Sequence, residues 1–263
     1  MSRGGAVRVE GERVPALRLA GLSKRFGGRR AVDGVELTVP SGSFYGLVGP
    51  NGAGKTTSLS MAVGLLRPDA GRAEVFGIDV WADPLPAKAL VGVLPDGLAL
   101  PERLTGLELL RYLGRLRGLD GRTVDSRAEE LLHVLELAEA AGTAVIDYST
   151  GMRKKIGLAL AMLHAPWLLV LDEPFEAVDP VSAATVRTIL GRFVAAGGSV
   201  VLSSHVMPLV ESLCDHVAVI AGGRVAAAGT LAEVRGGRAL EDVFVELVGA
   251  RTGGAEGLEW LAS

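Results

Sequence analysis

The chain has 263 residues, 49% of them hydrophobic, and this length and apolar content fit one large folded domain or two closely packed subdomains rather than a disordered chain. The formal net charge of −3 at pH 7 gives no electrostatic case for a nucleic-acid partner. The single cysteine, Cys214, excludes a disulfide framework, and we expect it to be a small buried hydrophobic side chain.

Residues 1–15 carry scattered Arg, Glu and Gly residues without the apolar stretch of a signal peptide, so we expect a flexible arm there. The longest apolar stretch, Ile156 to Leu171, is interrupted by His164 and Pro166. It is too short to cross a bilayer, and we therefore expect no direct membrane span.

The segment from about residue 16 onward has the pattern of an α/β core. Apolar runs and turn residues predict four strands or strand pairs and one helix in its first part. These are a strand pair, Leu17–Leu22 with Val35–Val39, that turns at Gly27-Gly28; a buried strand, Phe44–Val48; a helix, Thr56–Leu66; and strands at Ala73–Phe76 and Leu90–Leu94.

A helical segment of about fifty residues, 97–150, then interrupts this core. Within it, Glu102–Leu119 and Arg127–Ala141 have apolar residues at helical spacing. We predict that it forms a helical subdomain inserted in a larger domain, 16–240.

The strand and helix pattern resumes after this insertion, and the last part, 241–263, holds one short amphipathic segment and a tail. Asp179 is suited to cap a helix that has Pro180 at its first position. The other predicted elements are a helix, Met152–Leu163; strands at Trp167–Leu171 and Ser199–Leu202; and a strand pair, Val217–Ala221 with Arg224–Ala228.

The most specific motif is a glycine-rich loop directly after the apolar run Phe44–Val48. Its glycines allow successive backbone N–H groups to turn inward and hold phosphate oxygens. Lys55 can reach the β- and γ-phosphates of a nucleotide, and the Thr56 hydroxyl can bind Mg²⁺. The loop consists of Gly49, Pro50, Asn51, Gly52, Ala53, Gly54, Lys55, Thr56 and Thr57.

An acidic pair, Asp172 and Glu173, ends the apolar strand that begins at Trp167. The end of a parallel strand is where an α/β sheet binds its ligands. Asp172 is therefore suited to hold Mg²⁺ directly or through water, and Glu173 to polarise a water that attacks the γ-phosphate. The alternative is a strand that simply ends in soluble residues.

A second candidate anion site opens the helix that precedes this strand. Ser149, Thr150 and Gly151 offer free N–H groups and a hydroxyl, although Ser149 can also be an ordinary helix cap. One γ-phosphate cannot easily touch both this site and Lys55 within a single compact domain. The conflict indicates that a second molecule completes the site.

These motifs together resemble the ATPases of ABC (ATP-binding cassette) transporters over nearly the whole chain. The resemblance implies an α/β fold with a RecA-like P-loop NTPase core, an antiparallel β subdomain and the inserted α-helical subdomain. By the same resemblance, Ser149 and Gly151 belong to the signature motif, Asp179 to the D-loop, His205 is the switch histidine and Phe26 is the aromatic residue that stacks on adenine.

The resemblance also implies what the protein does. Two ATPase chains, identical or homologous, would bind two molecules of ATP with Mg²⁺ head to tail, and Glu173 and His205 would assist hydrolysis. Separate membrane-spanning permease chains would hold the dimer at the cytoplasmic face of a bacterial membrane. The form Ser149-Thr150-Gly151-Met152 is similar to that of antibiotic-resistance exporters, which favours export over import.

Asp96 departs from the family, which usually has Gln at this position. Two interpretations follow. In the first, Asp96 binds Mg²⁺, directly or through water, although its charge would repel the γ-phosphate. In the second, it serves only the Pro95-Asp96-Gly97 turn.

Two other functions compete with transport. A soluble regulator built on the same cassette would act on ribosomes or DNA, but such proteins usually carry two cassettes or a long coiled coil, and this chain has neither. A P-loop phosphotransferase would not need Ser149, Gly151 or His205. ATP consumption without a phosphorylated product would exclude it.

Overall fold

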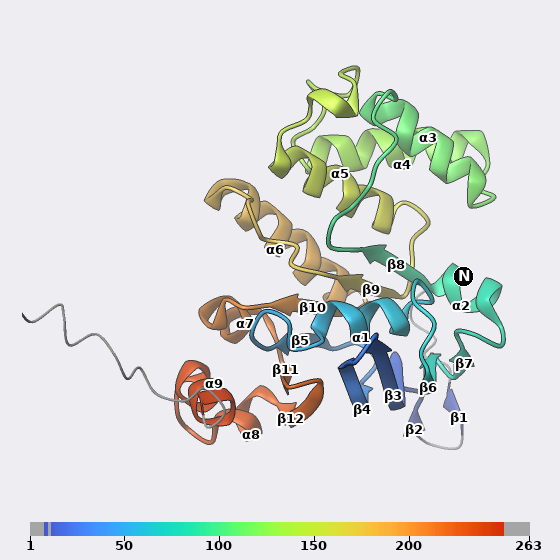
Figure 1. Ribbon diagram of the computed structural model, residues 1–263. Helices are drawn as coiled ribbons and strands as arrows, with labels where there is room; N and C mark the ends of the chain where they lie inside the picture. The colour runs from blue at the N-terminus through green and yellow to red at the C-terminus, as the bar shows by residue number, and fades with distance from the viewer. Residues whose placement is uncertain (1–7, 10–11, 250–263) are drawn as a thin grey trace, which may run out of the picture.

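Two sheets form the framework of the computed structural model, which describes residues 8–9 and 12–249 (Figure 1). The central sheet has the order β12-β11-β5-β10-β9-β8. Its strands all pair in parallel except for the antiparallel pair of β11 and β12. Its members are β5 (Phe44–Val48), β8 (Val91–Leu94), β9 (Leu168–Leu171), β10 (Ser199–Ser204), β11 (His216–Ala221) and β12 (Arg224–Thr230).

The second sheet is antiparallel and has the order β4-β3-β6-β7. Its long hairpin confirms the predicted strand pair, and both strands of the pair continue beyond their predicted bounds to the Gly27-Gly28 turn. The strands are β3 (Leu17–Phe26), β4 (Arg29–Val39), β6 (Ala70–Val75) and β7 (Ile78–Asp79). Of the predicted flexible arm, β1 (Arg8–Val9) pairs with β2 (Glu12–Arg13), and residues 1–7 and 10–11 lie outside the described residues.

Helix α1 (Lys55–Ala62) lies between the two sheets and joins their cores. Its buried residues Leu59 and Met61 belong to one hydrophobic cluster with Leu17 of the antiparallel sheet and Leu47 of the central sheet. The helix is shorter than the predicted Thr56–Leu66. It ends after Ala62 because Gly64 adopts a left-handed conformation, with φ +75°, that a helix cannot continue through.

Three helices lie together at the upper end of the molecule in Figure 1: α3 (Gly106–Leu116), α4 (Gly121–Val134) and α5 (Thr150–Met162). Their apolar faces share a core with β8 and β9, in which Leu109, Leu132 and Ile156 are buried. These helices fall within or border the segment 97–150. Its boundaries as a separate subdomain stay a prediction.

Both helices predicted in this segment begin directly after a capping residue, and their first residues therefore differ from the predicted ones. The α3 helix starts four residues later than predicted because Thr105 and Glu108 form a reciprocal capping box. The α4 helix starts earlier than the predicted Arg127, because the Asp120 carboxylate accepts a bond of 3.0 Å from the Thr123 N–H. The second helix ends at Val134, seven residues before the predicted Ala141, because Glu136 adopts a left-handed conformation with φ +58°.

The remaining helices cover the outer parts of the two sheets. Asp179 caps its helix as predicted, with its carboxylate accepting from the N–H groups of Val181 and Ser182. Among the residues described, no helix is both long and apolar enough to cross a membrane. These helices are α2 (Pro84–Leu90), α6 (Pro180–Ala195), α7 (Met207–Leu213), α8 (Leu231–Arg235) and α9 (Leu240–Gly249).

Gly92 marks the closest packing between the sheet and the three helices. A Cβ atom on Gly92 would lie 2.0 Å from the carbonyl oxygen of Ala161, which is main chain and cannot move aside. We expect Gly92→Ala to lower the free energy of unfolding by about 3 kcal/mol in urea denaturation, through overpacking. The control is Gly191→Ala on the open face of α6, which should leave stability equal or raise it by about 1 kcal/mol. Equal stability of the two variants would contradict this packing.

Candidate functional site

The glycine-rich loop between β5 and α1 is fixed by segments from both sheets. Gly54 has φ +106°, and a Cβ atom there would lie 2.5 Å from the carbonyl oxygen of Ala31 in β4. The carbonyl of Ala53 accepts from the N–H of Gly223, at 2.9 Å, and the carbonyl of Gly223 accepts from the N–H of Asp33, at 2.8 Å. Only glycine fits at position 54, and the turn between β11 and β12 supports the loop from behind.

Lys55 lies inside the loop and is only 7% exposed. Its ammonium group donates to the carbonyl oxygens of Gly49, at 2.6 Å, and Pro50, at 3.3 Å. Burial lowers the pKa of Lys55, and the negative charges of Glu173 and Asp172 oppose this shift. A buried cation with only carbonyl partners is suited to exchange them for phosphate oxygens.

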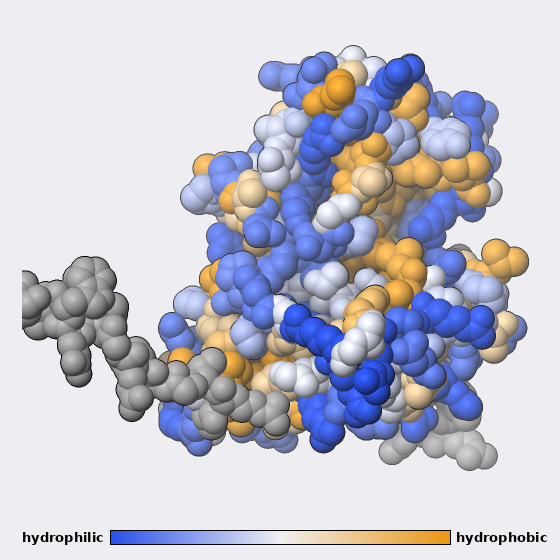
Figure 2. Space-filling view, in the orientation of Figure 1, coloured by the Kyte–Doolittle hydropathy of each residue, from blue (hydrophilic) through white to orange (hydrophobic). Residues whose placement is uncertain are grey.

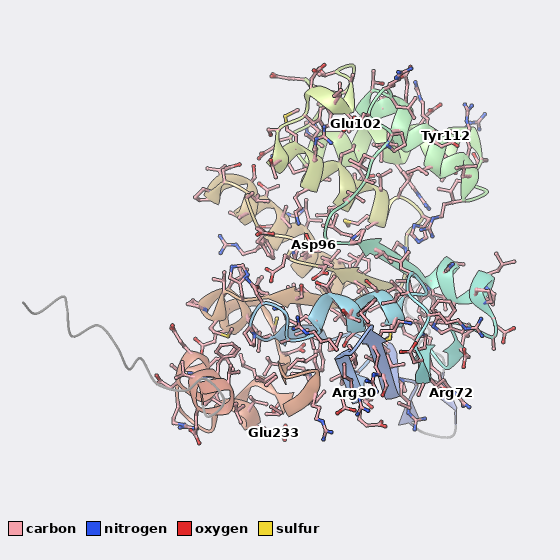
Figure 3. The ribbon with its side chains drawn as sticks, in the orientation of Figure 1. Arg30, Arg72, Asp96, Glu102, Tyr112 and Glu233 are labelled. Atoms are coloured by element: carbon pink, nitrogen blue, oxygen red, sulfur yellow. The ribbon has the colours of Figure 1, made fainter. Side chains whose placement is uncertain are left out.

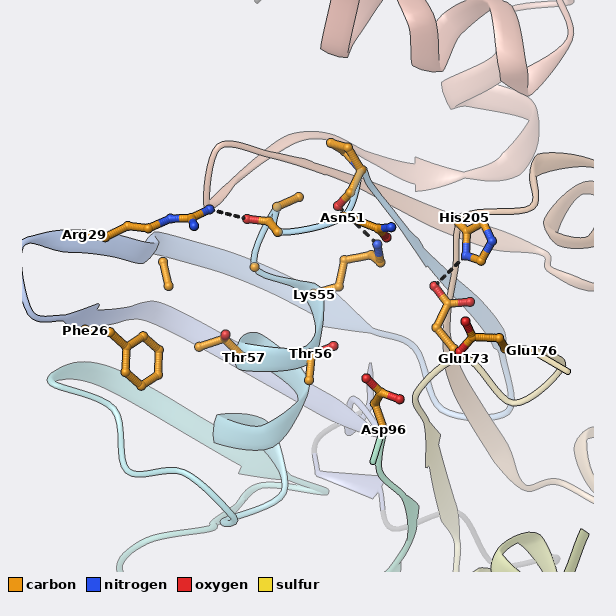
Figure 4. Close-up of a pocket in the computed structure, with 15 residues that line it drawn as sticks. Phe26, Arg29, Asn51, Lys55, Thr56, Thr57, Asp96, Glu173, Glu176 and His205 are labelled. Carbon is orange, nitrogen blue, oxygen red and sulfur yellow. Dashed lines mark hydrogen bonds and ion pairs between the residues drawn. The ribbon is translucent and has the colours of Figure 1, made fainter. Parts of the chain in front are cut away.

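A cavity of about 670 Å³ opens over this loop (Figure 4). It brings together most of the residues that the sequence indicates, from Phe26 beside the hairpin turn at one end to His205 at the other. The lining consists of Phe26, Arg29, Ala31, Pro50, Asn51, Gly52, Ala53, Gly54, Lys55, Thr56, Thr57, Asp96, Glu173, Glu176 and His205.

The acidic pair follows β9, as predicted, but its two members face different surroundings. Asp172 is 4% exposed and does not line the cavity. Its Oδ1 accepts a hydrogen bond from the Ser203 hydroxyl, which in turn accepts from the N–H of Glu173 at 2.9 Å. Glu173 lines the cavity, and the Nδ1 of His205 lies 3.1 Å from its Oε1 (Figure 4). An ionised Glu173 can only accept in this contact, so His205 donates through Nδ1.

Phe26 stands at the other end of the cavity, 52% exposed, where a base could stack on its ring. Across the hairpin turn, Arg29 donates from Nη2 to the carbonyl of Gly52 at 3.2 Å. Arg29 and Glu176 line the cavity and were not found from the sequence, because neither belongs to a motif. The pairing of Arg29 with Phe26 across a two-residue turn was the available signal.

Oxygen-bearing side chains of the kind that binds Mg²⁺ lie at or near this cavity. Thr56 and Asp96 line it, and Asp172 is buried at the end of β9 without lining it; their hydroxyl and carboxylate oxygens are the hard donors that suit a magnesium ion. Asp96 follows β8, where the chain leaves the sheet for the three helices (Figure 3). Its Oδ1 also accepts from the Gly97 N–H at 2.9 Å, so both interpretations of Asp96 have a structural basis.

We expect Asp96→Gln to keep ATP hydrolysis at or above the level of the parent chain. Gln retains an oxygen for a cation and for the Gly97 N–H, and it removes a charge whose repulsion of phosphate is worth about 1 kcal/mol across water. Steady-state phosphate release at varied Mg²⁺ measures the effect, with Asp96→Ala as the control without an oxygen. Loss of activity in Asp96→Gln alone would mean that the charge itself is required.

The second candidate anion site lies apart from this cavity. Ser149 caps α5, its hydroxyl accepting from the Met152 N–H at 3.2 Å, and neither Ser149 nor Gly151 lines the cavity. A Cβ atom on Gly151 would lie 3.6 Å from the carbonyl of Ala177, so the start of α5 adjoins the loop before α6. Asp179, in the same loop, also lies outside the cavity. Hydrogen bonds from Ser182 and Val181 hold its pKa below the usual value.

A loop of this geometry between a buried strand and a helix, beside an acidic strand end, defines a P-loop nucleoside triphosphatase. The chain belongs to the ABC transporter family, which matches residues 32–176. It is an ATP-binding subunit that hydrolyses ATP. The fold class and the family resemblance predicted from the sequence are both confirmed.

Three similar proteins illustrate the match. The chain is 41% identical over 220 residues to the daunorubicin/doxorubicin resistance ATP-binding protein DrrA of Streptomyces peucetius, covering 84% of this chain and 67% of that one. It is 37% identical over 216 residues to the Nod factor export ATP-binding protein I of Ralstonia nicotianae, covering 82% and 67%. A solved ATP-binding subunit of an ABC transporter superposes with a TM-score of 0.83 at 29% identity, over 88% and 99%.

Proposed function

We propose that this chain hydrolyses ATP to power export through separate membrane-spanning permease chains, as part of a head-to-tail dimer of ATPase subunits. The names of the related proteins, which include drug resistance and Nod factor export, support export. The division of the anion-binding groups between two places supports the dimer. Import and a regulatory role outside transport are the alternatives.

The observation that carries the proposal is the separation of Ser149 and Gly151 from the cavity that contains Lys55. In a head-to-tail dimer, each ATP would lie between the glycine-rich loop of one chain and the start of α5 in the other. The N-terminus of α5 offers free N–H groups and the positive end of the helix dipole to the γ-phosphate. Asp179, close to the same surface, would contact the partner chain.

Within one half-site, each residue has a defined part. Phe26 stacks on adenine, and Lys55 releases its carbonyl partners to bind the β- and γ-phosphates. Thr56, Asp172 and Asp96 would hold Mg²⁺, which supplies positive charge to the phosphates when bound. Glu173 accepts a proton from the attacking water, and His205 orients the Glu173 carboxylate through Nδ1.

A partly apolar recess below the three helices is suited to the permease (Figure 2). Helices α3 and α2 both carry exposed hydrophobic residues, Tyr112 and Leu116 on α3 and Leu85 on α2. The guanidinium of Arg117, at the end of α3, donates to the carbonyl of Lys88 in α2 at 3.0 Å, which brings the two helices together. Loops of a permease at the cytoplasmic face of a bacterial membrane would dock here.

Copurification from bacterial membranes tests the proposal. A tagged chain expressed with the membrane protein encoded beside it should retain that protein in mild detergent. Leu116→Asp should weaken the retention, whereas Val245→Asp, at a similarly exposed position on α9, should not. Retention of ribosomes or DNA instead of a multi-span membrane protein would contradict a role in transport.

A further inference from the structure

Glu173 has a backbone conformation that its surroundings must maintain. Its φ of +46° lies in the left-handed region, which residues with a side chain rarely adopt. Such conformations persist where neighbouring groups fix them, and they are concentrated at functional sites. The direction of the Glu173 carboxylate therefore depends on what holds its main chain.

Two side chains from other elements hold the two polar groups of this residue's main chain. The N–H of Glu173 donates to the hydroxyl of Ser203, on β10, at 2.9 Å. The carbonyl of Glu173 accepts from the ammonium of Lys154, on α5, at 3.0 Å, in addition to the N–H of Glu176 at 3.2 Å.

We propose that Ser203 and Lys154 are positioning residues for ATP hydrolysis, which fix the Glu173 main chain so that its carboxylate faces the nucleotide cavity. The inference rests on the proposed role of Glu173 as the group that activates water. It goes beyond that role, because neither Ser203 nor Lys154 lines the cavity or contacts the carboxylate.

Ser203 is fully buried and has a single proton to donate, which it gives to Asp172. Its oxygen is then oriented to accept from the Glu173 N–H. The parallel pairing of Leu202 with Leu171 places the serine beside the end of β9, where both acids follow. One hydroxyl thus orients two consecutive acidic residues.

Lys154 lies on the first turns of α5, the helix that Ser149 caps. It therefore connects the start of this helix, where a partner chain's nucleotide would bind, with the water-activating residue of its own chain. A small rotation of α5 would reach the Glu173 carbonyl through this contact.

The test compares kcat, KM and nucleotide affinity in substituted full-length chains. Ser203→Ala and Lys154→Gln should each lower kcat by about tenfold or more, because a small misplacement of a reacting group is costly. KM and the affinity for a fluorescent ATP analogue, measured in EDTA, should change by less than about twofold. Ser203→Thr and Lys154→Arg, which keep the donor or acceptor, should recover most of the rate.

Two controls separate positioning from folding. Ser199→Ala, at the other end of β10, also removes a buried hydroxyl that accepts a backbone N–H, from Gly42 at 2.8 Å, and should lower the melting temperature without lowering kcat. Lys88→Gln, on α2, should leave kcat unchanged. The proposal is overturned if Lys154→Gln keeps full kcat, or if kcat and affinity fall together in both variants. Normal turnover in Glu173→Gln would instead overturn the proposed role of Glu173.

Discussion

Replacing Glu173 by Gln is expected to abolish most ATP hydrolysis while ATP binding persists. Gln has the shape of Glu and can still accept from the Nδ1 of His205, but it cannot take a proton from water. Loss of a general base costs about a hundredfold to ten-thousandfold in rate. Phosphate release should fall by that factor. Size-exclusion chromatography with ATP should show an accumulated dimer, because the closed dimer cannot hydrolyse its ATP and reopen.

Glu176→Gln is the matched control for this experiment. Glu176 lines the same cavity three residues further along, and only its main chain bonds to Glu173. The substitution removes a similar charge from the same cavity and should keep most of the rate. Near-normal turnover in Glu173→Gln would show that another group activates the water.

The second expected result concerns the division of the ATP site between two chains. Two differently tagged chains are coexpressed, both with Glu173→Gln, and mixed dimers are isolated. When one chain carries Lys55→Ala and the other Ser149→Arg, both defects fall in one site of a head-to-tail dimer. The remaining site is intact, so the dimer should still retain ATP.

The matched control places both substitutions in the same chain and leaves its partner otherwise unchanged. In a head-to-tail dimer, each site then receives one defect, and retained ATP should fall to background. If every site were complete within one chain, the unsubstituted partner would keep its own ATP in this arrangement. Filter binding with radiolabelled ATP distinguishes the two results, and equal retention in both arrangements would contradict a shared site.

The sequence predicted the elements whose chemistry is local. The glycine-rich loop, the Asp172-Glu173 pair and the Asp179 cap each occupy a few consecutive residues, and their surroundings follow from the strand or helix beside them. Helix ends were less predictable, because Gly64 and Thr105 end or begin helices inside apolar patterns that continue past them. Apolar spacing alone does not detect such backbone signals.

Contacts between segments that are distant along the chain could not be predicted from the sequence. Ser203 directly follows the predicted strand Ser199–Leu202 and belongs to no motif, and its position between the two acids depends on the register of β10 against β9. Lys154 reads as one of several basic residues on a helix. The α2 helix was missed because two of its seven residues, Pro84 and Pro86, are prolines, which normally argue against a helix.

The bond between Ala53 and Gly223 has a consequence for how the protein is made. A ribosome that has translated as far as Thr57 has already produced every residue of the glycine-rich loop, yet the turn that supports it lies some 170 residues further along. The nascent chain therefore gains this support for its ATP site only after the ribosome has also translated the turn between β11 and β12. Premature termination before this turn would yield fragments that carry the complete motif without the support that shapes it.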